Sequence, residues 1–298
     1  MFTPNFVKKG DKIAIVSTAK KVNYREIEEA IYWLKQWGLE PVKGSTIDKV
    51  HHQFAGSDSE RVEDFQRMLD SNDIKAIWCA RGGYGTIRIL DGIDFSVFKK
   101  QPKWIIGYSD ITVLHSHIHN FKIKTIHAAM PFDFYKGTQA SINSLEEVLF
   151  GQLGAYTIAS SKKNKTGKGS GQLIGGNLSI LYSLCGSPSA LDTAGKILCI
   201  EDLDEYLYHI DRMLYNLKRN GYFDQLSGLI VGGMTKMHDN IIPFGRNVKE
   251  IILDIVQEYD FPVAFNFPMG HIEDNRALIL GSKIALEVSK ESVKFEYI

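Results

Sequence analysis

Short apolar runs alternate with amphipathic stretches through the first half of the chain. The apolar runs predict strands at residues 12–17, 39–42, 76–80, 104–106 and 125–128. The stretches between them place apolar residues at helical spacing and predict helices at about 24–37, 58–69 and 111–120, with a shorter helical segment through Ile87 and Leu90. Strands that alternate with helices are typical of a parallel sheet with crossover connections. The pattern therefore predicts an α/β fold in this half.

A polar, glycine-containing stretch without periodicity follows at 159–170 and predicts an interdomain linker, although a long surface loop within one domain is the alternative. Beyond it, the pattern predicts helices at about 178–184, 208–219 and 248–258, and strands at 197–200, 229–231 and 263–266. Alternation in the tail, at 285–289 and 293–297, predicts antiparallel strands. The expected division is an N-terminal domain at 1–155, a linker at 156–170 and a C-terminal domain at 171–298.

Composition narrows the class of protein. A length of 298 residues suggests two domains, although one large α/β domain is also possible. Lys plus Arg and Asp plus Glu number 35 each, so no global basic field attracts nucleic acid or an anionic membrane. No apolar run approaches the roughly 18 residues of a membrane span, and the first strand is too short for a signal-peptide core. These features predict a cytoplasmic protein with no nucleic-acid or membrane partner.

Two glycine-bearing turns follow predicted strands, where an open parallel sheet places its chemistry. In the segment 107–110, Ser109 stands on a tight strand-to-helix turn that would expose a nucleophilic hydroxyl, but it would equally serve as a helix N-cap. In the segment 81–85, three glycines would let backbone N–H groups converge on an oxyanion, or would simply supply the positive φ of a tight turn.

The second half offers a carboxylate and a histidine. Glu201 follows a predicted strand, where it would orient a histidine, and a solvated acidic loop is the alternative. His271 lies in a loop bracketed by Gly and Pro, where a general base is plausible and an incidental histidine is common. His115 and His119 have zinc-ligand spacing on a helix, but the Glu of the metalloprotease motif and a third ligand are missing. We therefore expect no metal and no organic cofactor.

Five ordered segments together resemble the LD-carboxypeptidase family, which includes murein tetrapeptide carboxypeptidases and microcin-immunity peptidases. The segments cover nearly the whole chain, and they are Arg-Gly-Gly-Tyr-Gly at 81–85, Gly-Tyr-Ser-Asp-Ile-Thr at 107–112, Gly-Gly-Asn-Leu at 175–178, Glu-Asp at 201–202 followed by Tyr-His-Ile-Asp-Arg-Met-Leu at 208–214, and Gly-His at 270–271 with Asn275. The resemblance implies an N-terminal flavodoxin-like parallel sheet with flanking helices and a C-terminal β-rich α/β domain. It also implies a homodimer.

The resemblance assigns roles residue by residue. Ser109 becomes the nucleophile, His271 the general base and Glu201 its orienting carboxylate, so that both domains contribute to the triad. The backbone N–H groups of Gly83 and Asp110 become the oxyanion hole. Arg81 is a candidate for binding the substrate carboxylate, on position alone, with a surface salt bridge as the alternative.

The activity that the resemblance implies is hydrolysis of the amide bond between an L-configured centre and a terminal D-alanine in cytosolic murein peptides. An immunity-type peptidase that cleaves a peptidyl or aminoacyl nucleotide is the alternative, and a non-catalytic binding protein of the same fold is a third interpretation. Two departures bear on the substrate. Ala128-Ala129 stands where the family commonly has Gly-Pro, and Ile279 stands where a proline is frequent.

Overall fold

The chain divides into two units, which are described separately. The computed structural model describes the backbone of all 298 residues and the side chains of residues 1–132 and 134–298. The first unit comprises Met1–Gln152 and Glu273–Ile279, and the second comprises Leu153–Ile272 and Leu280–Ile298. A short segment from late in the chain therefore belongs to the N-terminal unit, which the hydrophobic pattern did not predict.

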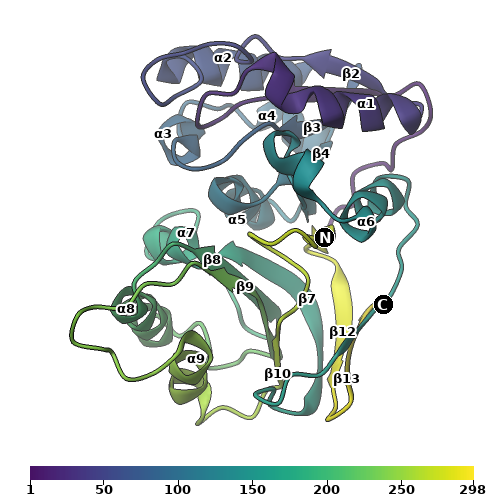
Figure 1. The fold of residues 1–298 in the computed structure, drawn as a ribbon. Coiled ribbons are helices and arrows are strands. Elements are labelled where there is room, and N and C mark those ends of the chain that lie inside the picture. The colour runs from purple at the N-terminus through teal and green to yellow at the C-terminus, as the bar shows by residue number, and fades with distance from the viewer. The chain divides into compact units, whose positions relative to one another are not determined.

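The first unit is built on a sheet with the strand order β2-β1-β3-β4-β5-β11 (Figure 1). The strands are β1 (Lys12–Val16), β2 (Glu40–Lys43), β3 (Ile74–Cys79), β4 (Trp104–Gly107), β5 (Thr125–His127) and β11 (Leu278–Leu280). β1 pairs in parallel with β2 and β3, and β4 pairs in parallel with β3 and β5. The order 2-1-3-4-5 is that of flavodoxin-like sheets, so the predicted class of the N-terminal fold is confirmed.

The helical segments of the first unit are η1 (Tyr24–Ile27), α1 (Glu28–Gln36), α2 (Asp58–Asp70), α3 (Thr86–Leu90), α4 (Ser96–Lys100), η2 (Ser109–Ile111), α5 (Thr112–Asn120), η3 (Pro131–Lys136) and α6 (Gln139–Leu149). Sequence chemistry fixes the start of α2. Ser57 and Glu60 form a capping box, in which each side chain binds the backbone N–H of the other residue. The helices predicted at 24–37, 58–69 and 111–120 are confirmed, whereas α4, η3 and α6 were not predicted.

The second unit contains a mixed sheet with the order β10-β9-β8-β7-β12-β13-β6. Its strands are β6 (Tyr156–Ala159), β7 (Gly167–Asn177), β8 (Ile197–Leu203), β9 (Gly228–Thr235), β10 (Val263–Phe265), β12 (Lys283–Val288) and β13 (Ser292–Tyr297). β7 through β10 run parallel, and β12 pairs antiparallel with both β7 and β13. This arrangement confirms the β-rich second half and its antiparallel tail.

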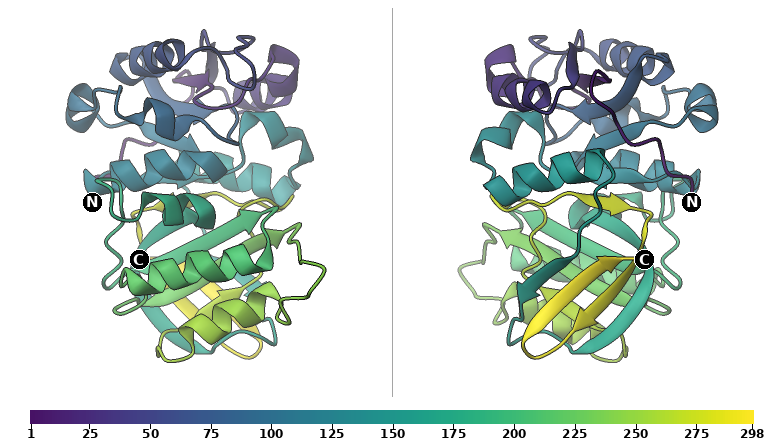
Figure 2. Two further views of the ribbon diagram at one scale, coloured as in Figure 1. Left: turned by 90° about the vertical axis from the view of Figure 1, so that its left-hand side faces the viewer. Right: turned by 90° about the vertical axis from the view of Figure 1, so that its right-hand side faces the viewer.

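Three helices bury the apolar core of the second unit against its parallel strands. They are α7 (Leu178–Leu184), α8 (Leu207–Arg219) and α9 (Val248–Val256). Figure 2 shows α8 and α9, in green, in front of this sheet in its left view and the β12–β13 pair, in yellow, in its right view. The parallel part is thus covered by helices, as buried parallel strands require.

The segment predicted as a linker has a regular structure at both ends. β6 occupies Tyr156–Ala159, and β7 begins at Gly167, so most of 156–170 lies in or between strands of the second unit. The change of unit falls between Gln152 and Leu153. Gly167–Gln172, at the start of β7, pairs with Lys283–Val288 far along the chain. Because a polar strand that depends on a distant partner has no local hydrophobic pattern, the sequence pattern predicted a linker here.

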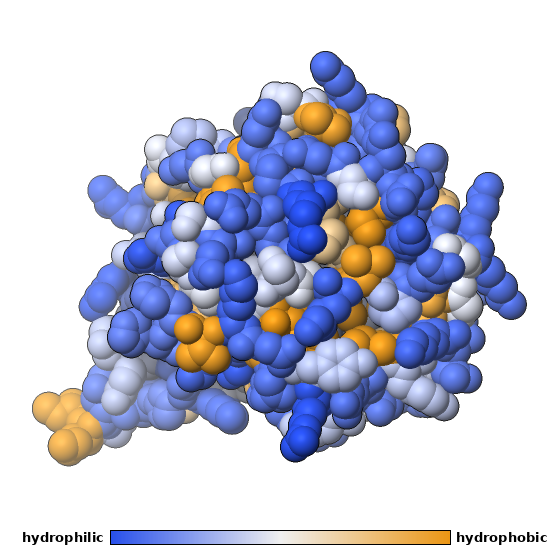
Figure 3. All heavy atoms as spheres, turned by 90° about the horizontal axis from the view of Figure 1, so that it is seen from above, coloured by the Kyte–Doolittle hydropathy of each residue, from blue (hydrophilic) through white to orange (hydrophobic). Residues whose placement is uncertain are grey.

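The surface of the molecule is mostly polar on the face drawn in Figure 3. Figure 3 shows a mostly hydrophilic face on which hydrophobic residues form small separate spots. Of the helices in the described part of the chain, none combines the length and the apolar character that crossing a membrane requires.

Candidate functional site

Ser109 has a strained backbone at the end of β4. Its φ is +61°, in the left-handed region that a serine rarely adopts. The N-cap positions of η2 and α5 are Tyr108 and Ile111, and across the described residues neither helix start receives a capping hydrogen bond from the Ser109 side chain. The helix-cap interpretation of Ser109 therefore fails. Strain of this kind persists only where the surroundings enforce it, and it is common at active sites.

Tight packing and one hydrogen bond hold this turn. A Cβ atom added at Gly107 would lie 2.8 Å from Ile111 Cγ1, so only glycine fits there. His115 Nε2 lies 2.9 Å from the Gly107 carbonyl oxygen, and because a carbonyl only accepts, Nε2 carries the hydrogen. Burial lowers the pKa of His115 to about 3, so this ring is neutral. The histidine that sequence reasoning weighed as a zinc ligand therefore supports the Ser109 turn, and no group of three or more metal-binding side chains occurs among the described residues.

The glycine turn at 81–85 lies against the Ser109 turn. A Cβ atom added at Gly82 would be 3.4 Å from the backbone nitrogen of Asp110. Gly83 has φ +100°, in the left-handed region that favours glycine, so this residue supplies the positive φ of a tight turn. The two candidate oxyanion donors, the amides of Gly83 and Asp110, thus belong to adjoining turns at the carboxyl ends of β3 and β4.

The side chain of Asp110 is occupied by a structural contact. Its Oδ2 accepts a hydrogen bond of 2.9 Å from the backbone N–H of Thr86 at the start of α3, while Oδ1 is buried. Burial raises the pKa of this carboxyl. The carboxyl therefore ties the nucleophile turn to α3 and leaves the backbone amide as the part of Asp110 that would face a reacting group.

In the second unit, Glu201 and His271 form a directly bonded pair. His271 Nδ1 lies 2.7 Å from Glu201 Oε2, and the His271 backbone N–H donates to the same oxygen at 3.3 Å. Glu201 is fully buried, and its carboxylate fixes the hydrogen on Nδ1. Nε2 is then the ring nitrogen with a lone pair that can accept a proton, as a general base requires.

The loop that carries His271 is shaped around this carboxylate. Gly270 has φ +93°, and a Cβ atom there would lie 2.6 Å from Cβ, Cγ and Oε2 of Glu201. β9 holds the loop through the Gly233 N–H, which donates to Met269 O at 2.9 Å, and through Thr235 Oγ1, which donates to His271 O at 3.3 Å. The predicted strand 197–200 was too short. β8 continues to Leu203, so Glu201 lies within the strand and not in a solvated loop.

Asp202 is a second buried carboxyl that sequence reasoning cited only as part of a motif. It accepts hydrogen bonds from Asn177 Nδ2 at 2.9 Å and from the Ser179 backbone N–H at 2.8 Å. Burial, followed by the charge of Glu201, raises the pKa of Asp202 to about 7. Asp202 therefore links β8 to the start of α7 beside the Glu201–His271 pair.

Arg81 packs beside the glycine turn. Its guanidinium carbon is 3.8 Å from the centre of the Phe132 ring, and its Nη1 donates to the Lys21 carbonyl oxygen at 3.0 Å. The predicted alternative, a surface salt bridge, is not found among the described residues. The guanidinium keeps further N–H donors for a ligand.

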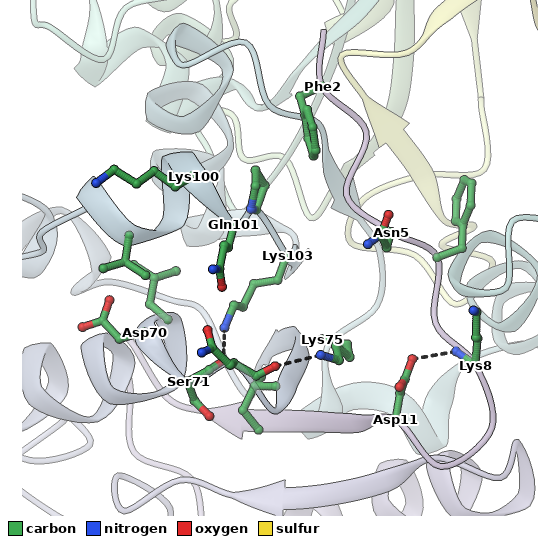
Figure 4. A pocket seen from close by; sticks show the side chains of 16 residues that line it. Phe2, Asn5, Lys8, Asp11, Asp70, Ser71, Lys75, Lys100, Gln101 and Lys103 are labelled. Carbon is green, nitrogen blue, oxygen red and sulfur yellow. Dashed lines mark hydrogen bonds between the residues drawn. The ribbon is translucent and has the colours of Figure 1, made fainter.

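A cavity of the first unit lies away from the two turns. Its volume is about 780 Å³, and Figure 4 shows Asp11, Lys75 and Lys103 among its lining residues. Asp11 and Lys103 immediately precede β1 and β4, so this cavity lies at the amino ends of the strands. Lys103 donates there to the carbonyls of Met68 and Ser71 at the end of α2. Ser109 and the glycine turn lie at the carboxyl ends of the strands, where α/β sheets bind their substrates, so this cavity is not the candidate site.

These parts define a class of protein. A serine held on a strained strand-to-helix turn beside backbone amides, and a histidine bonded to a buried carboxylate, are the components of a serine hydrolase. The structure brings Ser109, Asp110 and the glycine turn together in the first unit, and Glu201 and His271 together in the second.

Comparison with known proteins identifies the family. Residues 13–128 match the model of the LD-carboxypeptidase N-terminal domain, and residues 170–286 match that of the LD-carboxypeptidase C-terminal domain. The chain therefore belongs to the LD-carboxypeptidase family, as its motifs predicted, and is a serine-type hydrolase.

Relatives of known name cover nearly the whole chain. The probable murein peptide carboxypeptidase of Bacillus subtilis is 35% identical over 99% of this chain and 94% of its own length. The microcin C7 self-immunity protein MccF of Escherichia coli is 26% identical over 93% of this chain and 88% of its own length. The crystal structure of muramoyltetrapeptide carboxypeptidase from Oxalobacter formigenes superposes with a TM-score of 0.88 at 26% identity, covering 96% of this chain and 98% of that one.

Proposed function

We propose that the protein hydrolyses the amide bond between an L-configured residue and a terminal D-alanine in murein peptides, through Ser109, His271 and Glu201. The observation that carries the proposal is the 2.7 Å bond from His271 Nδ1 to the buried Glu201, which prepares a histidine for general-base chemistry. The names of the relatives in Bacillus subtilis and Oxalobacter formigenes support the substrate class.

In the proposed reaction, His271 Nε2 accepts the proton of the Ser109 hydroxyl as its oxygen attacks the scissile carbonyl carbon. The amides of Gly83 and Asp110 stabilise the tetrahedral oxyanion. His271 then protonates the departing amine of D-alanine, which leaves an acyl group on Ser109. Water, activated by the same histidine, hydrolyses this ester and restores the serine. Glu201 stabilises the imidazolium that forms in each half-reaction.

The remaining parts of the proposal concern recognition and context. Arg81 would bind the terminal carboxylate of the peptide, since its guanidinium keeps donors beyond its contact with Lys21 O. We place the reaction in the cytoplasm, in the recycling of cell-wall peptides, and propose a homodimer, which light scattering after gel filtration would detect.

The decisive experiment is chromatographic measurement of D-alanine released from murein tetrapeptide, in the presence of EDTA. Wild-type protein should release D-alanine under these conditions, and Ser109→Ala should reduce the rate by orders of magnitude while leaving the circular dichroism spectrum unchanged. Unchanged turnover in Ser109→Ala would refute the serine mechanism. Absence of turnover in the wild type would refute murein tetrapeptide as the substrate.

The second candidate keeps the chemistry and changes the substrate. Similarity to MccF favours cleavage of a peptidyl or aminoacyl nucleotide. The same Ser109-dependent assay distinguishes the two when aspartyl sulfamoyl adenosine replaces the tetrapeptide. A higher kcat/KM for the conjugate would select the immunity-type activity.

A further inference from the structure

The side chain of Lys20 covers the glycine turn that adjoins the nucleophile. A Cβ atom added at Gly83 would lie 2.6 Å from Lys20 Cδ and 2.8 Å from Lys20 Cε. The neighbouring Gly82 lies against the backbone nitrogen of Asp110, one residue after Ser109. The lysine stem therefore extends over the same turn that supplies the proposed oxyanion donor.

The backbone of Lys20 is fixed in this position from several sides. Its N–H donates to Gly82 O at 3.4 Å, and its carbonyl accepts from Ser17 Oγ at 2.7 Å. An isolated bridge joins it to Phe54. Because these contacts hold the backbone and Gly83 supports the methylene groups, the ammonium group is confined to a small region beside the turn.

The ammonium group keeps its hydrogen-bonding capacity. Within the described residues, Lys20 Nζ forms no hydrogen bond or ion pair. Its positive charge acts on the nearby carboxyl of Asp110, whose pKa it lowers against the larger effect of burial. That carboxyl is engaged with Thr86, so it does not neutralise the lysine by direct contact. Arg61, the other cation that acts on Asp110, donates to Thr18 O and Gly85 O. An unneutralised cation beside an oxyanion hole attracts an anionic part of the substrate.

We propose that Lys20, alongside Arg81, binds the free carboxylate of the terminal residue that is released, and so helps to make the enzyme a carboxypeptidase. The inference rests on the proposed function. Only three bonds separate the scissile carbonyl carbon from the terminal carboxylate carbon of the leaving residue, so the two groups must lie close together. With the carbonyl oxygen at the amides of Gly83 and Asp110, the carboxylate falls within the reach of a lysine that lies on Gly83.

The test compares one peptide in two forms, murein tetrapeptide with a free C-terminus and the same peptide as its C-terminal amide. Lys20→Met removes the charge and keeps the stem, and Lys21→Met is the matched control, since it removes the neighbouring charge from an exposed side chain. In Lys20→Met, kcat/KM for the acid should fall roughly 10- to 100-fold, the range for losing a charge-assisted hydrogen bond, while kcat/KM for the amide should change less than about twofold. Lys21→Met should leave both values near those of the wild type. Lys20→Arg should restore part of the preference for the acid.

Two outcomes would overturn the inference. An equal loss for acid and amide would show that Lys20 acts on the oxyanion or the fold, and an unchanged preference for the acid would show that the carboxylate binds elsewhere. A binding experiment detects failure of the proposed function separately. The tetrapeptide acid and its amide are each titrated by calorimetry into two inactive proteins, the Ser109→Ala single variant and the Ser109→Ala, Lys20→Met double variant. Acid-selective binding that depends on Lys20, without wild-type hydrolysis, would support the carboxylate site and refute the activity. Binding without such selectivity would refute the site.

Discussion

Replacing Gly270 by alanine should break the bond between Glu201 and His271 without replacing either residue. The added methyl group would lie 2.6 Å from three atoms of Glu201, including the Oε2 that accepts from the histidine. Glu201 is fully buried within β8, so its carboxylate has no open space into which to move. Relief must come from a shift of the loop that carries His271.

Two costs add in this variant. Forcing an extra methyl group into a packed site costs about 1–3 kcal/mol, and placing alanine at φ +93° costs about 1 kcal/mol more. The free energy of unfolding should therefore fall by about 2–4 kcal/mol. A displacement near 1 Å between catalytic groups lowers turnover by roughly 100-fold, so kcat/KM should fall by about that factor.

Gly245 provides a matched control in the same unit. It has φ +82°, and among the described atoms none lies within 4 Å of an added Cβ, so Gly245→Ala isolates the conformational cost of about 1 kcal/mol. All four tryptophans, at positions 33, 37, 78 and 104, belong to the first unit, so unfolding of the second unit should be followed in urea by circular dichroism. The reasoning is wrong if Gly270→Ala is as stable as Gly245→Ala, or if it retains wild-type kcat/KM.

Three further predictions test the surroundings of the two halves. Ser109→Gly relieves the strain at φ +61° and should be inactive. In urea unfolding followed by tryptophan fluorescence, it should be about 1 kcal/mol more stable than Ser109→Ala. Equal stability of the two variants would show that the turn is unstrained. His115→Ala should lower kcat/KM at least about tenfold by releasing Gly107 O, whereas His115→Gln, which keeps an N–H donor, should lose less. The pKa of Asp202 is raised to about 7, so the folded state favours the protonated carboxyl. The free energy of unfolding of the wild type, measured relative to that of Asp202→Asn, should therefore decline by more than about 1 kcal/mol as the pH rises from 4 to 8. A difference that does not change with pH would contradict the raised pKa.

The hydrophobic pattern predicted the elements whose periodicity is set locally. The helix at 178–184 has the predicted bounds, and the capping box at Ser57 fixed the start of α2. Elements that depend on distant partners were missed. β7 is an 11-residue strand whose polar first half pairs with the C-terminal tail, and β11 joins the sheet of the first unit from residue 278. Neither pairing leaves a mark in local periodicity.

The candidate residues were likewise predicted only in part. Family motifs pointed to Ser109, Glu201 and His271, and the structure supplies physical reasons for two of the turns: φ at Ser109 and the steric demand of Glu201 on Gly270. Lys20 was missed because its position over Gly83 arises from the bridge to Phe54 and from the bond to Gly82 O, contacts between residues far apart in sequence. The local sequence shows only that Lys20 lies shortly after the end of β1, which does not predict its contact with Gly83.

The two histidines His115 and His271 show why the environment, and not the residue type, assigns the base. His115 is the histidine bonded to the Ser109 turn, but its Nε2 hydrogen is donated to Gly107 O and burial holds its pKa near 3, so it accepts a proton poorly at neutral pH. His271 has the opposite arrangement, with Nδ1 bound by a buried carboxylate that stabilises the protonated ring. His271, bonded to a buried carboxylate, is therefore the histidine suited to accept a proton, and His115 is left to hold the Ser109 turn.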